Sequence, residues 1–176
     1  MKRDELSAHL DSGAKRVFIS RNAKDTIDRY VIPGINESSI KSSDQIISTT
    51  SSTTQVLALM VKMLDESFGL NRAMMTTVHA YTADQPLADA AGVDLRRSRS
   101  AVENIIPNTT LAPSIVENLM PQFSGKIDGI AFNVPVPNGS CVDLTTELEN
   151  TPSVDDANDA IKNFSKGSLE AVSYTH

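Results

Sequence analysis

A run of hydroxyl-bearing residues, Ser48 to Thr54, separates a strand-like start at Ile46 from a helix-like segment that continues through Gln55. A strand that turns directly into a helix places its turn at the helix N-terminus. There, free backbone N–H groups and the helix dipole attract anions and stabilise developing negative charge. The alternative interpretation is a Ser/Thr-rich helix cap with no further role. The pattern alone leaves both interpretations open.

Two further features carry side chains that could take part in chemistry. His79 is the polar residue at the end of a strand predicted over 73–81, where the plain interpretation is a histidine hydrogen-bonded to its surroundings. The long connection over 82–104 contains a basic island of Arg96, Arg97 and Arg99. A connection of this length inside a compact domain is usually functional or an interface element, although a solvated charged loop is the plain alternative.

The elements that position these residues fall into two groups. The first begins with a helix over 1–13 that ends at a glycine, followed by short strands over 14–20, 28–34 and 46–49. Helix, glycine and strand in this order are typical of an α/β unit.

The second group begins with a helix over 53–68, whose buried face is formed by five apolar residues, Val56, Leu57, Met60, Val61 and Leu64. Helices are also predicted over 109–123 and 153–164, and a last strand over 169–175. The strands over 127–136 and 141–149 are joined by Pro137-Asn138-Gly139, and Asn-Gly is a strong hairpin signal. The order of elements predicts an α+β fold, with an antiparallel or mixed sheet covered by helices.

Composition narrows the classes of function. The chain has 176 residues, 40% of them hydrophobic, a content that is typical of a globular protein. Its net charge of −6 argues against a nucleic-acid partner. Its single cysteine, Cys141, excludes an internal disulfide and fits a reducing compartment. No apolar run approaches the length of a membrane span. We therefore expect a cytoplasmic protein that binds neither nucleic acid nor membrane, with Cys141 as a small core residue.

Four segments together resemble one known family. These are the segments Ser48–Leu57 (STTSSTTQVL), Thr76–Ala80 (TTVHA), Asn104–Pro107 (NIIP) and Ala131–Leu144 (AFNVPVPNGSCVDL). In order and spacing they look like the catalytic domain of the phosphorylating glyceraldehyde-3-phosphate dehydrogenases. The segment DLRRSR from Asp94 and the tripeptide Pro121-Gln122-Phe123 look closer to the erythrose-4-phosphate dehydrogenase branch.

The resemblance implies a domain organisation and a reaction. Residues 1–47 would be the residual end of a nucleotide-binding domain, and 48–176 a catalytic-domain-like α+β domain truncated at its C-terminus. Members of the family are usually tetramers. A cysteine attacks the aldehyde, a histidine assists proton transfer, NAD takes a hydride, and phosphate releases the thioester as an acyl phosphate.

The sequence departs from the family at the nucleophile. The family motif Ser-Cys-Thr-Thr-Asn reads Ser51-Ser52-Thr53-Thr54-Gln55 here, so Ser52 occupies the former nucleophile position. A thiol can be held as thiolate near neutral pH, whereas a serine hydroxyl has a far higher pKa and needs a general base. His79 matches the catalytic histidine, and we expect it to be retained without its thiol.

The two anion sites of the family are matched unequally. Five residues correspond to phosphate-binding positions: Ser51, Thr53, Thr82, Arg99 and Thr110. The family's arginine in the Ala-Phe-Arg-Val-Pro strand is Asn133 here, and an asparagine supplies neither charge nor a bidentate fork. We therefore expect one weakened site and one that still binds phosphate or a sugar phosphate weakly.

The dinucleotide fingerprint Gly-x-Gly-x-x-Gly is not found in the sequence, so no cofactor is expected for this chain alone, although the family uses NAD. The leading hypothesis is a truncated, inactive relative with residual phosphate binding or a subunit-interaction role. Its partners would be copies of itself or a full-length dehydrogenase, contacted through residues 82–104. The alternative is a piece of a working NAD-dependent sugar-phosphate aldehyde dehydrogenase. A hydrolase that uses Ser52 and His79 ranks below both, because no third residue is seen to orient the base.

Overall fold

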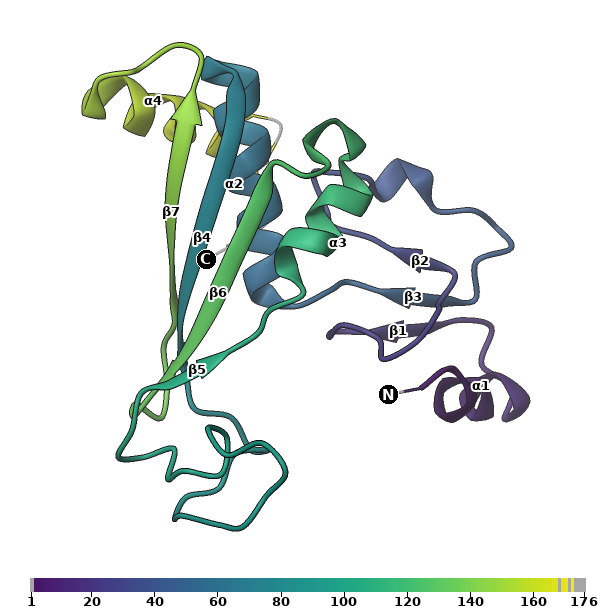
Figure 1. The fold of residues 1–176 in the computed structure, drawn as a ribbon. Helices are drawn as coiled ribbons and strands as arrows, with labels where there is room; N and C mark the ends of the chain where they lie inside the picture. The colour runs from purple at the N-terminus through teal and green to yellow at the C-terminus, as the bar shows by residue number, and fades with distance from the viewer. Residues whose placement is uncertain (1, 168, 171, 173–176) are drawn as a thin grey trace. The chain divides into compact units, whose positions relative to one another are not determined.

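The computed structural model describes residues 2–167, 169, 170 and 172, and the chain divides into two compact units (Figure 1). The first unit comprises residues 1–70 and 148–176, and the second comprises residues 71–147.

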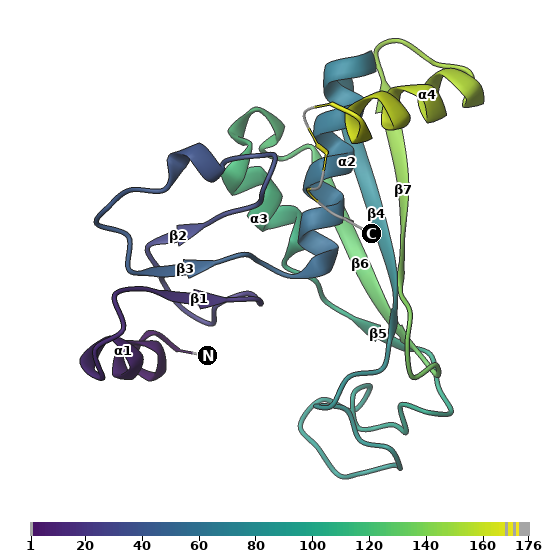
Figure 2. The same cartoon turned by 180° about the vertical axis from the view of Figure 1, so that it is seen from behind.

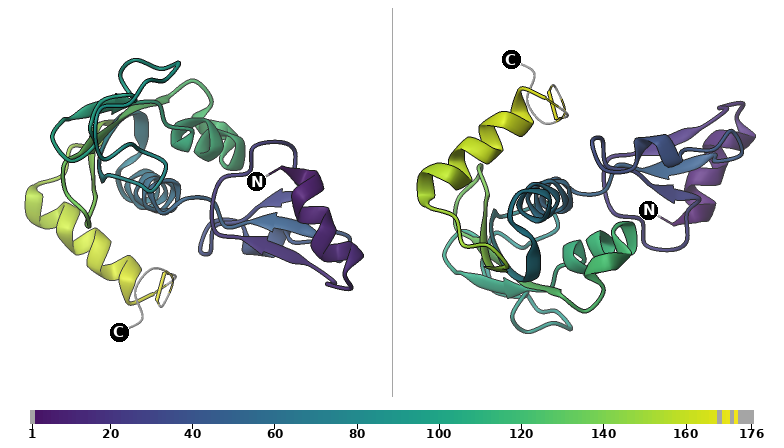
Figure 3. Two further views of the ribbon diagram at one scale, coloured as in Figure 1. Left: turned by 90° about the horizontal axis from the view of Figure 1, so that it is seen from below. Right: turned by 90° about the horizontal axis from the view of Figure 1, so that it is seen from above.

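The first unit begins with a small α/β layer (Figure 3). Its elements are α1 (Arg3–Asp11), β1 (Val17–Ile19), β2 (Arg29–Tyr30) and β3 (Ile46–Ser48), with a short 3-10 turn η1 (Glu37–Ser39) before β3. The three strands are parallel, in the order β1-β3-β2, and a core of Leu6, Ile19, Ala23 and Ile46 joins the helix to the sheet. The helix and the three strands predicted for this region are confirmed, each shorter than its predicted range.

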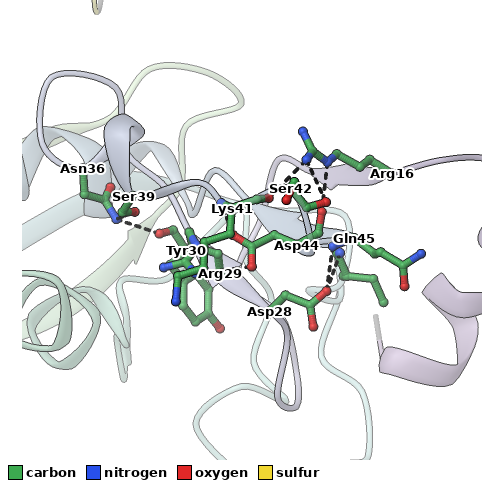
Figure 4. Close-up of polar contacts among 11 residues, drawn as sticks. Arg16, Asp28, Arg29, Tyr30, Asn36, Ser39, Lys41, Ser42, Asp44 and Gln45 are labelled. Carbon is green, nitrogen blue, oxygen red and sulfur yellow. Dashed lines mark hydrogen bonds and ion pairs between the residues drawn. The ribbon is translucent and has the colours of Figure 1, made fainter.

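The Asp28 carboxylate fixes the start of β3 (Figure 4). Its Oδ2 accepts the backbone N–H groups of Gln45 and Ile46 at 2.8 and 2.9 Å, and its Oδ1 pairs with Arg3 at 2.8 Å. The hydrogen bond from Ile46, followed by that from Arg3, lowers the pKa of Asp28 to about 2. The carboxylate thus ties β2 to β3 and to α1.

A second carboxylate, Asp44, organises the loop before β3 (Figure 4). It is 5% exposed, pairs with Arg29, and accepts the Lys41 N–H at 2.8 Å. Arg16, just before β1, binds the same loop by donating to the carbonyls of Asp44, Lys41 and Ser42. The hydrogen bond from Arg29 lowers the pKa of Asp44. These contacts of Arg16, Arg29 and Asp44 therefore hold the conformation of the loop that leads into β3.

Two helices complete the first unit, α2 (Ser52–Phe68) and α4 (Val154–Ser165), and they pack against each other. Of the predicted buried face of α2, Leu57 and Val61 are fully buried, whereas Val56 is 38% exposed. The helix ends at Gly69, which has a φ of +71°. Ser153 caps α4 in a reciprocal box with Asp156.

The second unit is built on a four-stranded mixed sheet. Its strands are β4 (Leu70–Ala80), β5 (Ile106–Asn108), β6 (Ile127–Val134) and β7 (Cys141–Leu148), in the order β5-β6-β4-β7. β4 and β6 are parallel and β5 is antiparallel to β6. Contacts of Arg72 with Glu147 and of Ala80 with Ser140 show that β7 runs antiparallel to β4. With α3 (Ala112–Leu119) packed on β6, this confirms the predicted α+β class.

The hairpin predicted at Asn138-Gly139 is wrong. β6 and β7 are consecutive and run in opposite directions, but β4 lies between them in the sheet (Figure 1). Neighbouring strands lie about 4.8 Å apart, so the connection has to span roughly 10 Å. Residues 135–140 are enough to cross that distance, whereas a two-residue turn would not be.

Two other predictions over this region need adjustment. The helix expected over 109–123 is split into α3 and a 3-10 turn, η2 (Pro121–Phe123), because proline disfavours a helical residue before it and leaves Met120 at a φ of −128°. The strand expected over 169–175 falls largely outside the described residues; residues 169, 170 and 172 form turns. Residues 81–105 contain no helix or strand (Figure 2).

Candidate functional site

The hydroxyl turn joins β3 to α2 and is held by side chains at both ends. Ser51 is the N-cap of α2; its Oγ accepts the Thr54 N–H at 3.2 Å and lies 2.8 Å from the Thr54 hydroxyl, which is buried. Ser48 Oγ donates to the Arg21 carbonyl at 2.7 Å and accepts the Thr50 N–H at 2.9 Å. The hydroxyl groups of Ser48 and Ser51 therefore form hydrogen bonds with backbone groups that fix the turn.

Thr50 shows how tightly this turn is specified. It is 1% exposed and has a φ of +65°, a conformation that costs a β-branched residue about 1–2 kcal/mol. The Gln55 side-chain amide donates to the neighbouring Thr49 carbonyl at 2.6 Å, which closes the turn from the helix side. Strained backbone held by its surroundings is typical of functional turns.

Ser52 is the first residue of α2 and is exposed, and Thr53 follows it half-buried. Within the described part of the chain, the Ser52 hydroxyl has no hydrogen-bond partner that could act as its base. The position offers the positive end of the helix dipole and backbone N–H groups, which suit an anion. Chemically, these backbone groups could bind an oxyanion.

His79 lies in the second unit, next to the end of β4. Its Nδ1 lies 2.7 Å from the carbonyl oxygen of Ala80. Because a carbonyl only accepts, Nδ1 must carry the hydrogen, so that Nε2 of the neutral ring is free to accept a proton.

Asn133 extends the contact at His79 into a chain of amides. It is opposite His79 in the register of β4 and β6 and is 7% exposed. Its Nδ2 donates to the same Ala80 carbonyl at 3.3 Å, and its Oδ1 accepts from Asn108 Nδ2 at 3.1 Å. The side chain of Asn133 is therefore hydrogen-bonded within the sheet, and it shares with His79 the carbonyl oxygen of Ala80.

We expect Asn133→Ala to lower the free energy of unfolding by about 1–3 kcal/mol, because it removes the acceptor of the half-buried Asn108 amide and one of the two hydrogen bonds to the buried Ala80 carbonyl. The His79 ring should also shift from one neutral tautomer to a mixture, as read from its ¹⁵N chemical shifts. Asn138→Ala, at an exposed position, is the control. Unchanged His79 nitrogen shifts in Asn133→Ala would exclude a positioning role for Asn133.

Like Ser51, three further predicted phosphate-binding residues already have protein partners. The Thr82 hydroxyl donates to Asp84, whose carboxylate pairs with Arg97 at 2.9 Å. The hydrogen bond from Thr82 lowers the pKa of Asp84, and the positive charge of Arg97 lowers it further. Arg99 pairs with Asp89 at 3.2 Å, and Thr110 Oγ1 accepts the Ala112 N–H at 3.2 Å. An anion here would have to compete with two carboxylates.

The predicted site residues are distributed over both compact units. Ser51, Ser52 and Thr53 lie together at the start of α2 in the first unit. The second unit holds the others: His79, Thr82, Arg99 and Thr110. Sequence reasoning missed Asn108 and Asp84, and only the spacing of Asp84 two residues after Thr82 could have suggested either. The expectation for Cys141 is wrong: it is exposed, at the start of β7.

Neither a metal centre nor a membrane segment is found in the described part of the chain. Its His, Cys, Asp and Glu side chains form no group of three or more that could hold a metal ion. None of its helices combines the length and the apolar character needed to span a bilayer.

Comparison with known proteins places the chain in a family. The family described as glyceraldehyde 3-phosphate dehydrogenase, C-terminal domain, matches residues 51–176. The chain belongs to this family. It is 47% identical over 168 residues to glyceraldehyde-3-phosphate dehydrogenase of Mycobacterium avium, covering 96% of this chain and 49% of that protein.

Two other relatives give the same picture. The enzyme of that name from Priestia megaterium is 44% identical over 172 residues, which cover 97% of this chain and 51% of the relative. Glyceraldehyde-3-phosphate dehydrogenase A, chloroplastic, of Scenedesmus vacuolatus is 46% identical over 167 residues, or 94% and 53%. The chain spans about half the length of the curated relatives it matches. The resemblance to the erythrose-4-phosphate branch stays a prediction.

Proposed function

We propose that this chain is a member of the glyceraldehyde-3-phosphate dehydrogenase family that no longer forms the thioester and that binds phosphate weakly at the start of α2. The observation that carries the proposal is Ser52, exposed at the first residue of a capped helix. The resemblance of Ser51–Gln55 to the family motif assigns this position to the nucleophilic cysteine. A serine without a base reacts too slowly with an aldehyde, and an ester is a poorer acyl donor to phosphate than a thioester.

Phosphate binding at the α2 N-terminus is testable residue by residue. We expect inorganic phosphate to shift the backbone amide signals of Ser52 and Thr53 with a dissociation constant of about 1 mM, about 4 kcal/mol of binding free energy. Ser51→Ala should weaken this binding, because it disturbs the cap that orders these N–H groups.

The N-terminus of α4 provides the control in the same sample. There, Asp155 and Asp156 occupy the first turn and repel an anion, so the amides of Val154 and Asp155 should not respond. Equal shifts at both helices would mean that phosphate only changes the ionic strength, and the proposed site would be rejected.

The second part of the proposal is an interaction role for residues 82–104, with a further copy of this chain or a full-length dehydrogenase as partner. Support comes from the large apolar side chains at the surface of this segment: Leu87 is 63% exposed and Leu95 81%. Native mass spectrometry of the purified chain, alone and mixed with a full-length relative, would test it. A monomer in both samples would refute the interaction role.

The alternative proposal is a working portion of an NAD-dependent sugar-phosphate aldehyde dehydrogenase. It is favoured by identities of 44–47% to proteins with the dehydrogenase name along nearly the whole chain. The His79 geometry described above would also serve such an enzyme. NADH formation from glyceraldehyde-3-phosphate or erythrose-4-phosphate, abolished by Ser52→Ala, would establish this alternative against the first.

A further inference from the structure

The connection between β6 and β7 carries a feature that the proposed function does not use. Asn138 is the only asparagine of the sequence that is followed by glycine, and both residues are exposed. The Gly139 N–H donates to Asn138 Oδ1 at 2.8 Å, which brings this nitrogen to the side-chain amide. Gly139 has a φ of +84°, and beyond its chain neighbours no atom of the described residues lies within 4 Å of the place where a Cβ would stand. The nitrogen is therefore both close and unhindered.

We infer that Asn138-Gly139 is a site of spontaneous deamidation through a succinimide. The deprotonated Gly139 nitrogen attacks Asn138 Cγ, a C–N bond forms, and the side-chain nitrogen leaves as ammonia. Water then opens the five-membered imide at either carbonyl. Opening at the side-chain carbonyl gives aspartate, and opening at the backbone carbonyl gives isoaspartate. Water is consumed, ammonia is released, and no oxidant or cofactor is needed.

The chain contains a close comparison at Asn108-Thr109. The Thr109 N–H donates to Asn108 Oδ1 at 2.9 Å, almost the same contact. Thr109, however, is β-branched and crowds its own nitrogen, and the Asn108 amide is held by Asn133 at 3.1 Å. Both pairs thus have the same kind of local hydrogen bond. They differ because only in Asn138-Gly139 are the following nitrogen uncrowded and the asparagine amide not held by another side chain. We expect Asn108 to be stable.

The consequence of the reaction reaches the end of β4. The connection is fastened to this strand end at two points: Tyr81 N–H donates to the Val136 carbonyl at 3.2 Å, and Ala80 N–H donates to Ser140 Oγ at 3.2 Å. Isoaspartate at 138 inserts one methylene into the backbone between these two points and adds a negative charge. We expect one of the two hydrogen bonds to weaken, which loosens Ala80 or Tyr81, the residues on either side of the carbonyl that orients His79.

The first experiment follows the chemistry in the intact chain. The purified protein is incubated in mildly alkaline buffer, and peptides are mapped by mass spectrometry with enzymatic methylation of isoaspartate. Asn138 should convert more than about tenfold faster than Asn108, the rate ratio that a barrier difference of about 1.4 kcal/mol produces. Asn138→Gln should abolish the isoaspartate signal, because glutamine forms its imide far more slowly. Conversion of Asn138 no faster than that of Asn108 would overturn the inference.

The second experiment separates the added charge from the added methylene. Asn138→Asp introduces the charge with a normal backbone, whereas aged protein carries isoaspartate as well. Amide hydrogen exchange at Ala80 and Tyr81 should accelerate in the aged protein and stay unchanged in Asn138→Asp and Asn138→Gln. Unchanged exchange in protein that contains isoaspartate would refute the effect on β4 while leaving the deamidation site itself established by the first experiment.

Discussion

Ser52→Cys, made in a Cys141→Ser background, is expected to react with an activated ester or with iodoacetamide several orders of magnitude faster than the parent protein reacts at Ser52. The background change is needed because Cys141 is exposed and would react itself. The thiol at the first residue of α2 should have a lowered pKa, because the helix N-terminus favours the thiolate. The pH dependence of the alkylation rate measures that pKa directly.

Val154→Cys combined with Asp155→Asn and Asp156→Asn is the matched control, because Val154 is the first residue of α4 and 77% exposed, and the two carboxylates would otherwise raise the thiol pKa. It places a thiol at the same position of a different helix. If the thiol pKa is lower in Ser52→Cys than in Val154→Cys, and His79→Gln removes the difference, the histidine still acts on the former nucleophile position. Equal reactivity of the two thiols would show that the turn retains only a helix end, and the relation to the family's chemistry would be lost at more than one residue.

Asp28→Asn is expected to lower the free energy of unfolding at neutral pH by about 2 kcal/mol. The pKa of Asp28 is lowered to about 2 in the folded protein, from an ordinary value of 3.8. A depressed pKa contributes stability above the ordinary value and loses it as the pH falls through the folded value. Each pH unit between the folded and unfolded pKa values is worth about 1.4 kcal/mol. Urea unfolding should therefore separate the two proteins above about pH 4.

The difference between the two proteins should shrink as the pH falls from about 4 to about 2, because the protonated aspartic acid of the parent then resembles the asparagine. Asp155→Asn serves as a control at an exposed carboxylate near a helix end. A stability difference that does not change between neutral pH and about pH 2 would show that Asp28 acts through packing or neutral hydrogen bonds instead of its charge.

Local signals predicted much of the fold. α1 follows from a helix-like segment over 1–13 that ends at a glycine, and α2 from the apolar spacing over 53–68. The relation of the chain to the dehydrogenases follows from four motifs taken together, because they match the family in order and in spacing. One of these motifs alone would not establish it. These features are encoded within a few residues of the chain, which is why they can be read without coordinates.

The failures share a physical cause, which is pairing between distant segments. Asn138-Gly139 has the composition of a hairpin turn, but β4 pairs with both β6 and β7, and local sequence does not encode that competition. Likewise, only the register of β4 and β6 sets Asn133 beside His79. Cys141 looks like a core residue by type, and its exposure depends on the sheet face that β7 presents.

The central position of β4 also sets the order in which the second unit can come apart. An outer strand is released when one ladder of hydrogen bonds breaks, whereas β4 is released only after the ladders to β6 and β7 have both broken. His79 is carried by that strand. Fraying of β5 would therefore leave the histidine on a strand that is still paired on both sides, and release of β4 itself would require the loss of both of its ladders.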